Sequence, residues 1–375
     1  MPSCFEANVI FILKCTTYKR STSTSTSYQA RFDADEVAKF EKMFRSLNDE
    51  CKWKLSSGRY VENVLYDFAV QCQYITPAHN LILDFEDNQI TALFNKEELE
   101  DIKQKNPFDF EENLPTEISS CFDLLKDKRS FDELFEATDS IVASPRTKPD
   151  TYWVKKTLIS SLELFLTSNT LSLSTKLSEK DLVRLVWCCL LNCCIGADIL
   201  VNTEKQHVSS GSVNQSISSI TKSTKQASGE FPDICYNYAG YDLGFCEAER
   251  FNKGSKATKR LNESRIKLPV MMKKALIRLI KKVSKKHSAS IVGFYASELE
   301  LEALTMCCPS GFVCLVTRSR IYTFPATLAL FKKEMKKLIT VVANVKKEMT
   351  RNVDLMTEDE DEDEGVELPL YTFPF

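Results

Sequence analysis

Phe231-Pro-Asp-Ile-Cys-Tyr236 and Tyr241-Asp-Leu-Gly-Phe-Cys-Glu-Ala-Glu-Arg250 are two strand-like segments that follow each other closely in the chain. Side chains two residues apart share a face of a strand, so Glu247 and Glu249 continue an otherwise apolar face. Asp233 joins them if the register of the hairpin places it opposite Glu247. The pattern therefore predicts three carboxylates at one end of a β-hairpin.

Grouped carboxylates of this kind indicate a hard divalent cation. Like charges side by side cost stability unless a cation or water compensates them. Oxygen ligands favour Mg²⁺ or Mn²⁺ over softer metals. The alternative, which the spacing alone leaves open, is a strand whose carboxylates emerge into solvent at the edge of a sheet.

The segments around this hairpin predict an α/β (α+β) fold. Ser178 followed by Asp181 resembles a capping box that starts a helix, and Ala239-Gly240 fits a tight hairpin turn. The predicted order is helix, strand, strand, strand, helix, strand, over residues 178–195, 199–203, 233–238, 241–250, 268–285 and 290–296.

This αβββαβ order, with Pro232-Asp233 on one strand and Glu247-Ala-Glu249 on the next, resembles the restriction-endonuclease-like PD-(D/E)xK nuclease superfamily. The longer strings Asp242-Leu-Gly-Phe-Cys-Glu247, Lys267-Leu-Pro269 and Trp53-Lys-Leu-Ser-Ser-Gly58 are similar to a group of uncharacterised proteins of early-diverging, mucoralean-type fungi. The resemblance implies metal-dependent hydrolysis of phosphodiesters, in which the metal activates a water molecule for attack.

The resemblance also implies roles for single residues. Asp233 matches the metal-binding Asp, Glu247 matches the acidic residue of the triplet, and Glu179 matches an accessory metal-binding Glu. Glu249 stands where the superfamily has the Lys that orients the attacking water and stabilises developing charge. This departure implies either that another cation has taken over the task or that hydrolysis has been lost.

Three cations follow the hairpin and are candidates for that task. Arg250 points to the opposite strand face from Glu249, which makes it a poor substitute. Lys253 and Lys267 remain as alternatives. A degenerate or unusually built site is the prediction, and Asp233, Glu247 and Glu249 are its candidate catalytic residues.

A strongly basic stretch indicates nucleic acid as a partner. Residues 250–286 hold 14 Lys or Arg and one acidic residue, although the net charge of the chain is −3. Basic side chains beside a carboxylate site suit phosphate contacts, and the candidates are Lys253, Lys267, Lys273, Lys274 and Arg278. The alternative is an amphipathic helix with a solvated basic face.

The cysteines favour an intracellular protein without a zinc site. The chain has 14 Cys and no recognisable secretory leader, which predicts reduced thiols in the nucleus or cytoplasm. Cys188, Cys189, Cys193 and Cys194 lack the paired knuckles of a zinc site and predict a buried helix face instead. No apolar run is long enough to span a bilayer, so no membrane association is expected.

The organisation of the chain predicts four parts: a flexible leader at 1–31, a mostly helical region at 32–150, the nuclease-like core at 151–350 with a long loop at 203–229, and an acidic disordered tail at 351–375. Two functions remain open at this point. One is a metal-dependent nuclease, and the other is a non-catalytic protein that keeps the fold to bind nucleic acid or another protein. A cation close to Asp233 and Glu247 in the folded chain would favour the first.

Overall fold

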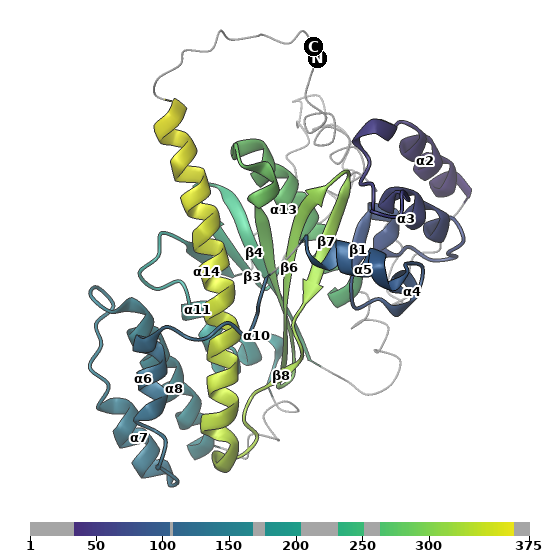
Figure 1. Ribbon diagram of the computed structural model, residues 1–375. Helices are drawn as coiled ribbons and strands as arrows, with labels where there is room; N and C mark the ends of the chain where they lie inside the picture. The colour runs from purple at the N-terminus through teal and green to yellow at the C-terminus, as the bar shows by residue number, and fades with distance from the viewer. Residues whose placement is uncertain (1–33, 106–107, 168–176, 204–231, 251–262, 364–375) are drawn as a thin grey trace, which may run out of the picture.

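A computed structural model describes residues 34–105, 108–167, 177–203, 232–250 and 263–363. These residues form a mixed α/β fold in which helices cover both faces of one twisted eight-stranded sheet (Figure 1). The predicted α/β class is therefore confirmed. Among the described residues, no helix is both long enough and apolar enough to cross a bilayer.

The sheet has the strand order β1-β7-β6-β5-β4-β3-β2, with β8 paired to β6. Strands β4 and β5 are parallel, as are β1 and β7, and the other neighbours are antiparallel. The strands are β1 Ile82–Asp84, β2 Leu200–Thr203, β3 Ile234–Tyr238, β4 Tyr241–Glu249, β5 Ser290–Ser297, β6 Glu300–Ser310, β7 Val313–Arg318 and β8 Tyr322–Thr323.

The helices of the first half are α2 Ala34–Arg45, α3 Val61–Ala69, α4 Asn88–Thr91, α5 Lys96–Lys103, α6 Thr116–Asp123, α7 Phe131–Asp139 and α8 Pro149–Thr167. Those of the second half are α10 Glu179–Asp181, α11 Cys188–Asn192, α13 Leu268–Lys282 and α14 Phe331–Asp363. Ser178 caps α10 by accepting a hydrogen bond from the Asp181 N–H, as its spacing predicts. π-helical turns at Leu182–Val186 and Glu263–Lys267 lead into α11 and α13.

The hairpin between β3 and β4 forms where the sequence predicts it. Ala239 and Gly240 both have positive φ, 48° and 84°, which is the requirement of a two-residue turn whose twist matches the flanking strands. A bulge between Tyr236 and Asn237 then shifts the register, so that Ile234 lies opposite Cys246. One residue before Ile234 and one residue after Cys246, the same register places Asp233 opposite Glu247.

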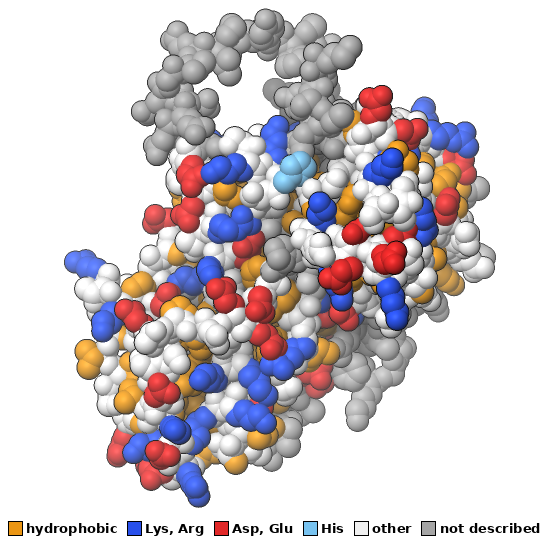
Figure 2. All heavy atoms as spheres, in the orientation of Figure 1, with side chains coloured by type: hydrophobic (Ala, Val, Ile, Leu, Met, Phe, Trp, Pro, Cys, Tyr) orange, Lys and Arg blue, Asp and Glu red, His pale blue; other side chains and the backbone are white. Residues whose placement is uncertain are grey.

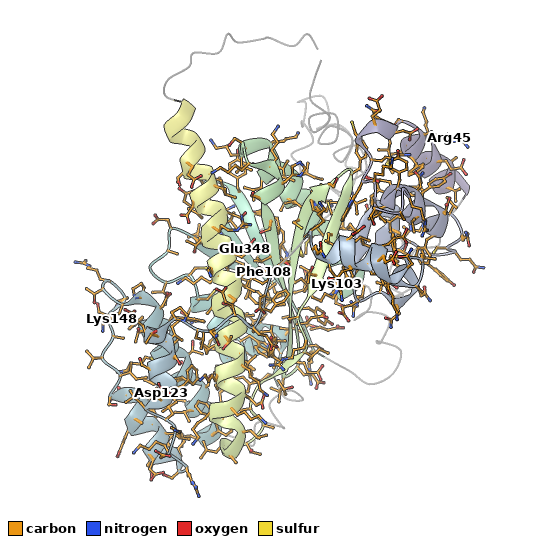
Figure 3. The ribbon with its side chains drawn as sticks, viewed as in Figure 1. Arg45, Lys103, Phe108, Asp123, Lys148 and Glu348 are labelled. Carbon is orange, nitrogen blue, oxygen red and sulfur yellow. The ribbon has the colours of Figure 1, made fainter. Side chains whose placement is uncertain are left out.

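Helices α13 and α14 lie on opposite faces of the sheet (Figure 1). A Cβ on Gly293 of β5 would meet the Met272 sulfur of α13 at 2.8 Å. Ser290, three residues earlier, faces the other way and hydrogen-bonds Glu348 of α14, which lies over the sheet in Figure 3. The carboxylates Glu247 and Glu249 lie on the α13 face, because Phe245 pairs with Gly293 and shares its face.

The N-terminal region is joined to the sheet and does not fold apart from it. Strand β1 pairs with β7, and the helices α2 and α3 share a hydrophobic core with Phe312, Val313 and Leu315. Glu62 of α3 is fully buried and accepts hydrogen bonds from the N–H groups of Trp53 and Phe312. The boundary near residue 150 therefore separates stretches of sequence but not two independent sheets.

The last helix is longer than predicted. Helix α14 continues to Asp363, whereas the sequence predicts a disordered tail from residue 351. The prediction follows from the acidic composition of this stretch, which is typical of disordered segments. The Lys285 ammonium lies 2.7 Å from the Glu358 carboxylate, and this ion pair compensates one negative charge near the end of α14. The predicted leader, nearly all of the loop at 203–229 and residues 364–375 lie outside the described residues.

Candidate metal and nucleic-acid site

The C-terminal end of β4 carries the predicted carboxylates. Asp233 lies just before β3 and accepts a hydrogen bond from the Ala248 N–H at 2.7 Å, so its carboxylate is fixed against the backbone between Glu247 and Glu249. Both glutamates are almost fully buried, with 5% and 3% of their surface exposed. The three predicted catalytic residues therefore lie at the same end of the hairpin.

Lys267 reaches this place from the start of α13. Its ammonium lies 2.8 Å from Glu247 Oε2, and about a quarter of its side chain is exposed. The π-helical turn that ends at Lys267 and Pro269 at the beginning of the helix fix the direction of approach. Of the two cations that the sequence leaves as alternatives, Lys267 is beside the carboxylates, and Lys253 lies outside the described residues.

Glu249 has a different neighbour. The hydroxyl of Tyr295 on β5 donates a hydrogen bond to Glu249 Oε2, and Tyr295 is itself the register partner of Glu247. A charge-assisted hydrogen bond from a phenol stabilises a buried carboxylate. Glu249 is thus held by a neutral donor, and Glu247 by a cation.

Glu179, the predicted accessory ligand, contacts the chain just after β4. Its Oε1 accepts a hydrogen bond from the Arg250 N–H at 3.4 Å, so α10 touches the chain directly after the strand. Asp233 and Glu247 offer the paired carboxylate oxygens that Mg²⁺ uses when waters and substrate phosphates complete its shell. The oxygen atoms of these residues are of the chemical type that this ion takes as ligands. Within the described parts of the chain, no group of three or more His, Cys, Asp or Glu is arranged as a ready-made metal cage.

A buried ion network supports the turn that presents Lys267. Arg318, at the end of β7, is fully buried and donates from Nε to Asp84 at 2.8 Å and from Nη1 to Glu302 at 2.9 Å. Its third contact is the Ser264 carbonyl oxygen at 2.9 Å. Arg265 adds a longer ion pair to Asp84 at 3.4 Å. The segment from Ser264 to Lys267 is therefore anchored to both β1 and β7.

The ionisable side chains lie in a row across the sheet. Glu247 is paired with Tyr295, and Tyr295 with Glu302, on successive strands. Directly opposite residues of neighbouring strands point to the same face, so the row continues from the hairpin to Arg318. The α13 face of the sheet thus carries a continuous polar band at one end of an otherwise apolar core.

Sequence analysis misses Tyr295, Glu302, Arg318 and Asp84. The available signal is weak: Arg318 and Asp84 are charged residues that end otherwise apolar strands, and each is common at such a position. Asp84 and Arg318 are 234 residues apart in the chain. A pattern of neighbouring residues in the sequence cannot predict a contact between segments so far apart.

Helix α13 carries three of the predicted nucleic-acid contacts, and one of them is not at the surface. Lys273 is fully buried and its ammonium donates to the Asn80 carbonyl oxygen, so it does not face solvent and is wrong as a nucleic-acid contact. The turn Pro77–Asn80 covers this side of α13, and nothing in the helix itself reveals that cover. Lys274 and Arg278 are half-buried on α13, and the Arg278 guanidinium lies 5.4 Å from the ring centre of Tyr241.

The cysteines of α11 and its surroundings are buried. Burial raises the pKa of Cys189 to well above its usual range, and it raises the pKa of Cys246 as well. The charges of Asp233 and Glu247 raise the pKa of Cys246 further, which places both carboxylates close to one thiol. A thiol with a raised pKa is a poor nucleophile and a poor metal ligand.

Comparisons with protein-family models, with curated proteins and with solved structures give no match. What this chain does must therefore be argued from the residues that its fold brings together.

Proposed function

We propose that this protein is an atypical metal-dependent nuclease-like hydrolase that acts on the phosphodiesters of nucleic acid. The observation that supports it is the 2.8 Å contact between Lys267 Nζ and Glu247 Oε2. The sequence lacks the triplet Lys, and Lys267 supplies a cation at the carboxylates from a neighbouring helix.

Each residue has a defined task in this proposal. Asp233 and Glu247 would hold Mg²⁺ or Mn²⁺, and Glu179 would contribute from α10. The metal would supply charge stabilisation and a water of lowered pKa. Lys267 orients the attacking water and offsets the negative charge that develops on the phosphate, while Tyr295 keeps Glu249 fixed.

The second candidate is a non-catalytic nucleic-acid-binding protein. The burial of Glu247 and its ion pair with Lys267 favour it, because the same pair stabilises the fold without any metal. In this case Lys267 neutralises the carboxylate, and the half-buried cations Lys274 and Arg278 of α13 contact phosphate.

The test uses the full chain and two measurements. Calorimetric titration with Mg²⁺ and Mn²⁺ measures metal binding, and incubation with plasmid DNA, single-stranded DNA and RNA measures cleavage. We expect Asp233→Asn to lose metal binding, and Lys267→Met to keep metal binding while its cleavage rate falls about a hundredfold or more. Lys281→Met removes an exposed Lys of the same helix and is the matched control.

Two outcomes separate the candidates. Metal binding and cleavage that are both lost in Asp233→Asn but kept in Lys281→Met support the hydrolase. A wild-type chain that retards nucleic acid in gel shifts, yet binds no metal and cleaves nothing, supports the binding protein.

A further inference from the structure

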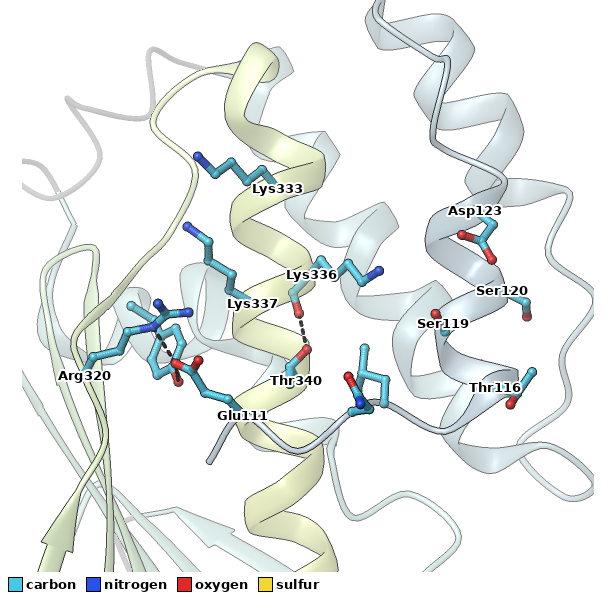
Figure 4. A pocket seen from close by; sticks show the side chains of 13 residues that line it. Glu111, Thr116, Ser119, Ser120, Asp123, Arg320, Lys333, Lys336, Lys337 and Thr340 are labelled. Atoms are coloured by element: carbon cyan, nitrogen blue, oxygen red, sulfur yellow. Dashed lines mark hydrogen bonds and ion pairs between the residues drawn. The ribbon is translucent and has the colours of Figure 1, made fainter. Parts of the chain in front are cut away.

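A second basic site lies on the opposite face of the sheet from the carboxylates. A cavity of about 640 Å³ opens between α14 and α6, with Arg320 beside β8 at its side (Figure 4). Four cations line it, against the two carboxylates of Glu111 and Asp123. Lys and Arg side chains also gather over the lower half of α14 in the space-filling view (Figure 2).

Two of these cations are uncompensated. Lys333 and Lys336 are exposed, and neither ammonium has a hydrogen-bond or ion-pair partner among the residues that the structure describes. The other two are engaged: Lys337 pairs with Glu334 at 2.9 Å, and Arg320 pairs with Glu111 at 2.7 Å. The cavity thus keeps a positive surplus that an anion would satisfy.

The position of these lysines in their helix adds an independent argument. The first two turns of α14 carry four Lys and one acidic residue, Glu334. The N-terminus of a helix has a partial positive charge, so cations there reduce stability. A bound anion would offset the unfavourable interaction of these lysines with the helix dipole, and two of them line the cavity without a partner among the described residues.

The walls of the cavity are fixed at both ends. At one end, Lys332 donates to the carbonyl oxygens of Lys126 and Lys128, at 2.6 and 2.8 Å. At the other end, the Asn344 amide donates to the carbonyl oxygens of Phe110 and Glu112, at 3.1 and 2.9 Å. Because α14 is tied to the α6 side above and below the cavity, the space is formed before any ligand arrives.

The lining also offers a neutral donor. Ser119 and Ser120 of α6 lie across the cavity from α14, and Lys336 extends toward them in Figure 4. The Ser120 hydroxyl already donates to the Glu117 carbonyl oxygen at 2.8 Å, so Ser119 is the donor for a ligand. Hydroxyls opposite lysines are suited to phosphate oxygens. Lys333 and Lys336 are about 4.5 Å apart along the helix axis. Their side chains extend to opposite sides of α14 in Figure 4, so a ligand with more than one phosphate is needed to contact both.

We propose that this cavity binds a small molecule that carries two or more phosphate groups, held by Lys333 and Lys336 with the Ser119 hydroxyl of α6. A fixed cavity of this volume lies within the usual range for small-molecule sites. The site is separate from the carboxylates of β4 and does not depend on the function proposed for them.

The experiment is a calorimetric titration of the full chain with inorganic tripolyphosphate and, in a second arm, with ATP. The test variant is Lys333→Ala/Lys336→Ala. The control is Lys39→Ala/Lys42→Ala on α2, which removes two exposed lysines with the same spacing and changes the net charge equally. We expect the test variant to weaken binding about tenfold or more, with the control unchanged.

The arms also distinguish the sources of the phosphate. Equal affinity for both probes indicates that phosphate groups alone are recognised, and tighter binding of ATP indicates a nucleotide; both support the proposal. No binding of either probe, or equal loss in test and control variants, overturns it. Competition by a single-stranded oligonucleotide that needs the same two lysines, at a lower concentration than either probe, overturns it in favour of nucleic acid.

Discussion

The Arg318 guanidinium donates to the Ser264 carbonyl oxygen at 2.9 Å, and through this bond a residue at the end of β7 fixes the turn that presents Lys267. The same guanidinium contacts Asp84 and Glu302. One fully buried cation therefore holds two carboxylates and the backbone next to the candidate site.

Replacing Arg318 by Met should lower the free energy of unfolding by about 3 to 5 kcal/mol, because Asp84 and Glu302 lose their shared buried cation. Urea unfolding followed by circular dichroism measures the change. Arg320→Met is the matched control: its pair with Glu111 is half exposed, and the expected loss is below about 1 kcal/mol. Similar losses in the two variants would contradict the role given to the buried network.

Tyr295→Phe tests the hydrogen bond to Glu249. The substitution removes one hydroxyl beside a carboxylate that is 3% exposed, so we expect a loss of about 1 to 3 kcal/mol in unfolding free energy. Tyr322→Phe is the control, because the Tyr322 hydroxyl donates at 3.1 Å to the half-exposed Glu111. A loss no larger for Tyr295→Phe than for this control would show that the bond to Glu249 contributes little.

Two glycines on neighbouring strands should respond differently to Ala. A Cβ on Gly244 would lie 2.5 Å from the Val292 Cγ2 atom and 3.0 Å from its carbonyl oxygen, and the strand backbone cannot retreat easily. We expect Gly244→Ala to cost about 1 to 3 kcal/mol. At Gly293 the close atom is the Met272 sulfur, whose flexible side chain can move, so Gly293→Ala should be nearly neutral in the same unfolding experiment.

His79 should make stability depend on pH. Burial is the main cause that lowers the pKa of His79 from 6.5 to about 4. Above pH 6.5 the imidazole is neutral in both the folded and unfolded chain. As the pH falls from 6.5 toward 4, only the unfolded chain takes up the proton, so stability is lost in this window, by roughly 3 kcal/mol in full.

The check is a comparison of unfolding free energies at pH 7.5 and pH 5 for the wild type and His79→Asn. The wild type should lose roughly 2 kcal/mol more than the variant over this interval. Parallel losses in the two proteins would mean that groups other than His79 determine the pH dependence.

Short-range patterns predict much of the fold. Ala239-Gly240 gives the hairpin, Ser178 gives a helix start, and Pro269 marks the beginning of α13. Each depends on neighbours within a few residues, which the sequence displays directly. The side-by-side placement of Asp233 and Glu247 follows in the same way from the register of one hairpin.

Contacts between distant segments account for the rest. Lys273 has the spacing of a solvated helix face, yet Asn80 covers it from 193 residues away. Helix α14 passes its predicted end with help from a lysine outside the helix. Lys267 is one of several cations that follow the hairpin, and only the packing of α13 against β4 and β5 selects it.

The pairing of β1 with β7 has a consequence for how the chain comes to be folded. Asp84 meets Arg318 only after 234 further residues have been synthesised, and contacts of such separation form slowly. The helices α2 and α3 therefore leave the ribosome long before the strand that completes their core exists. During that interval the N-terminal region exposes the apolar surface that Phe312, Val313 and Leu315 cover in the folded protein.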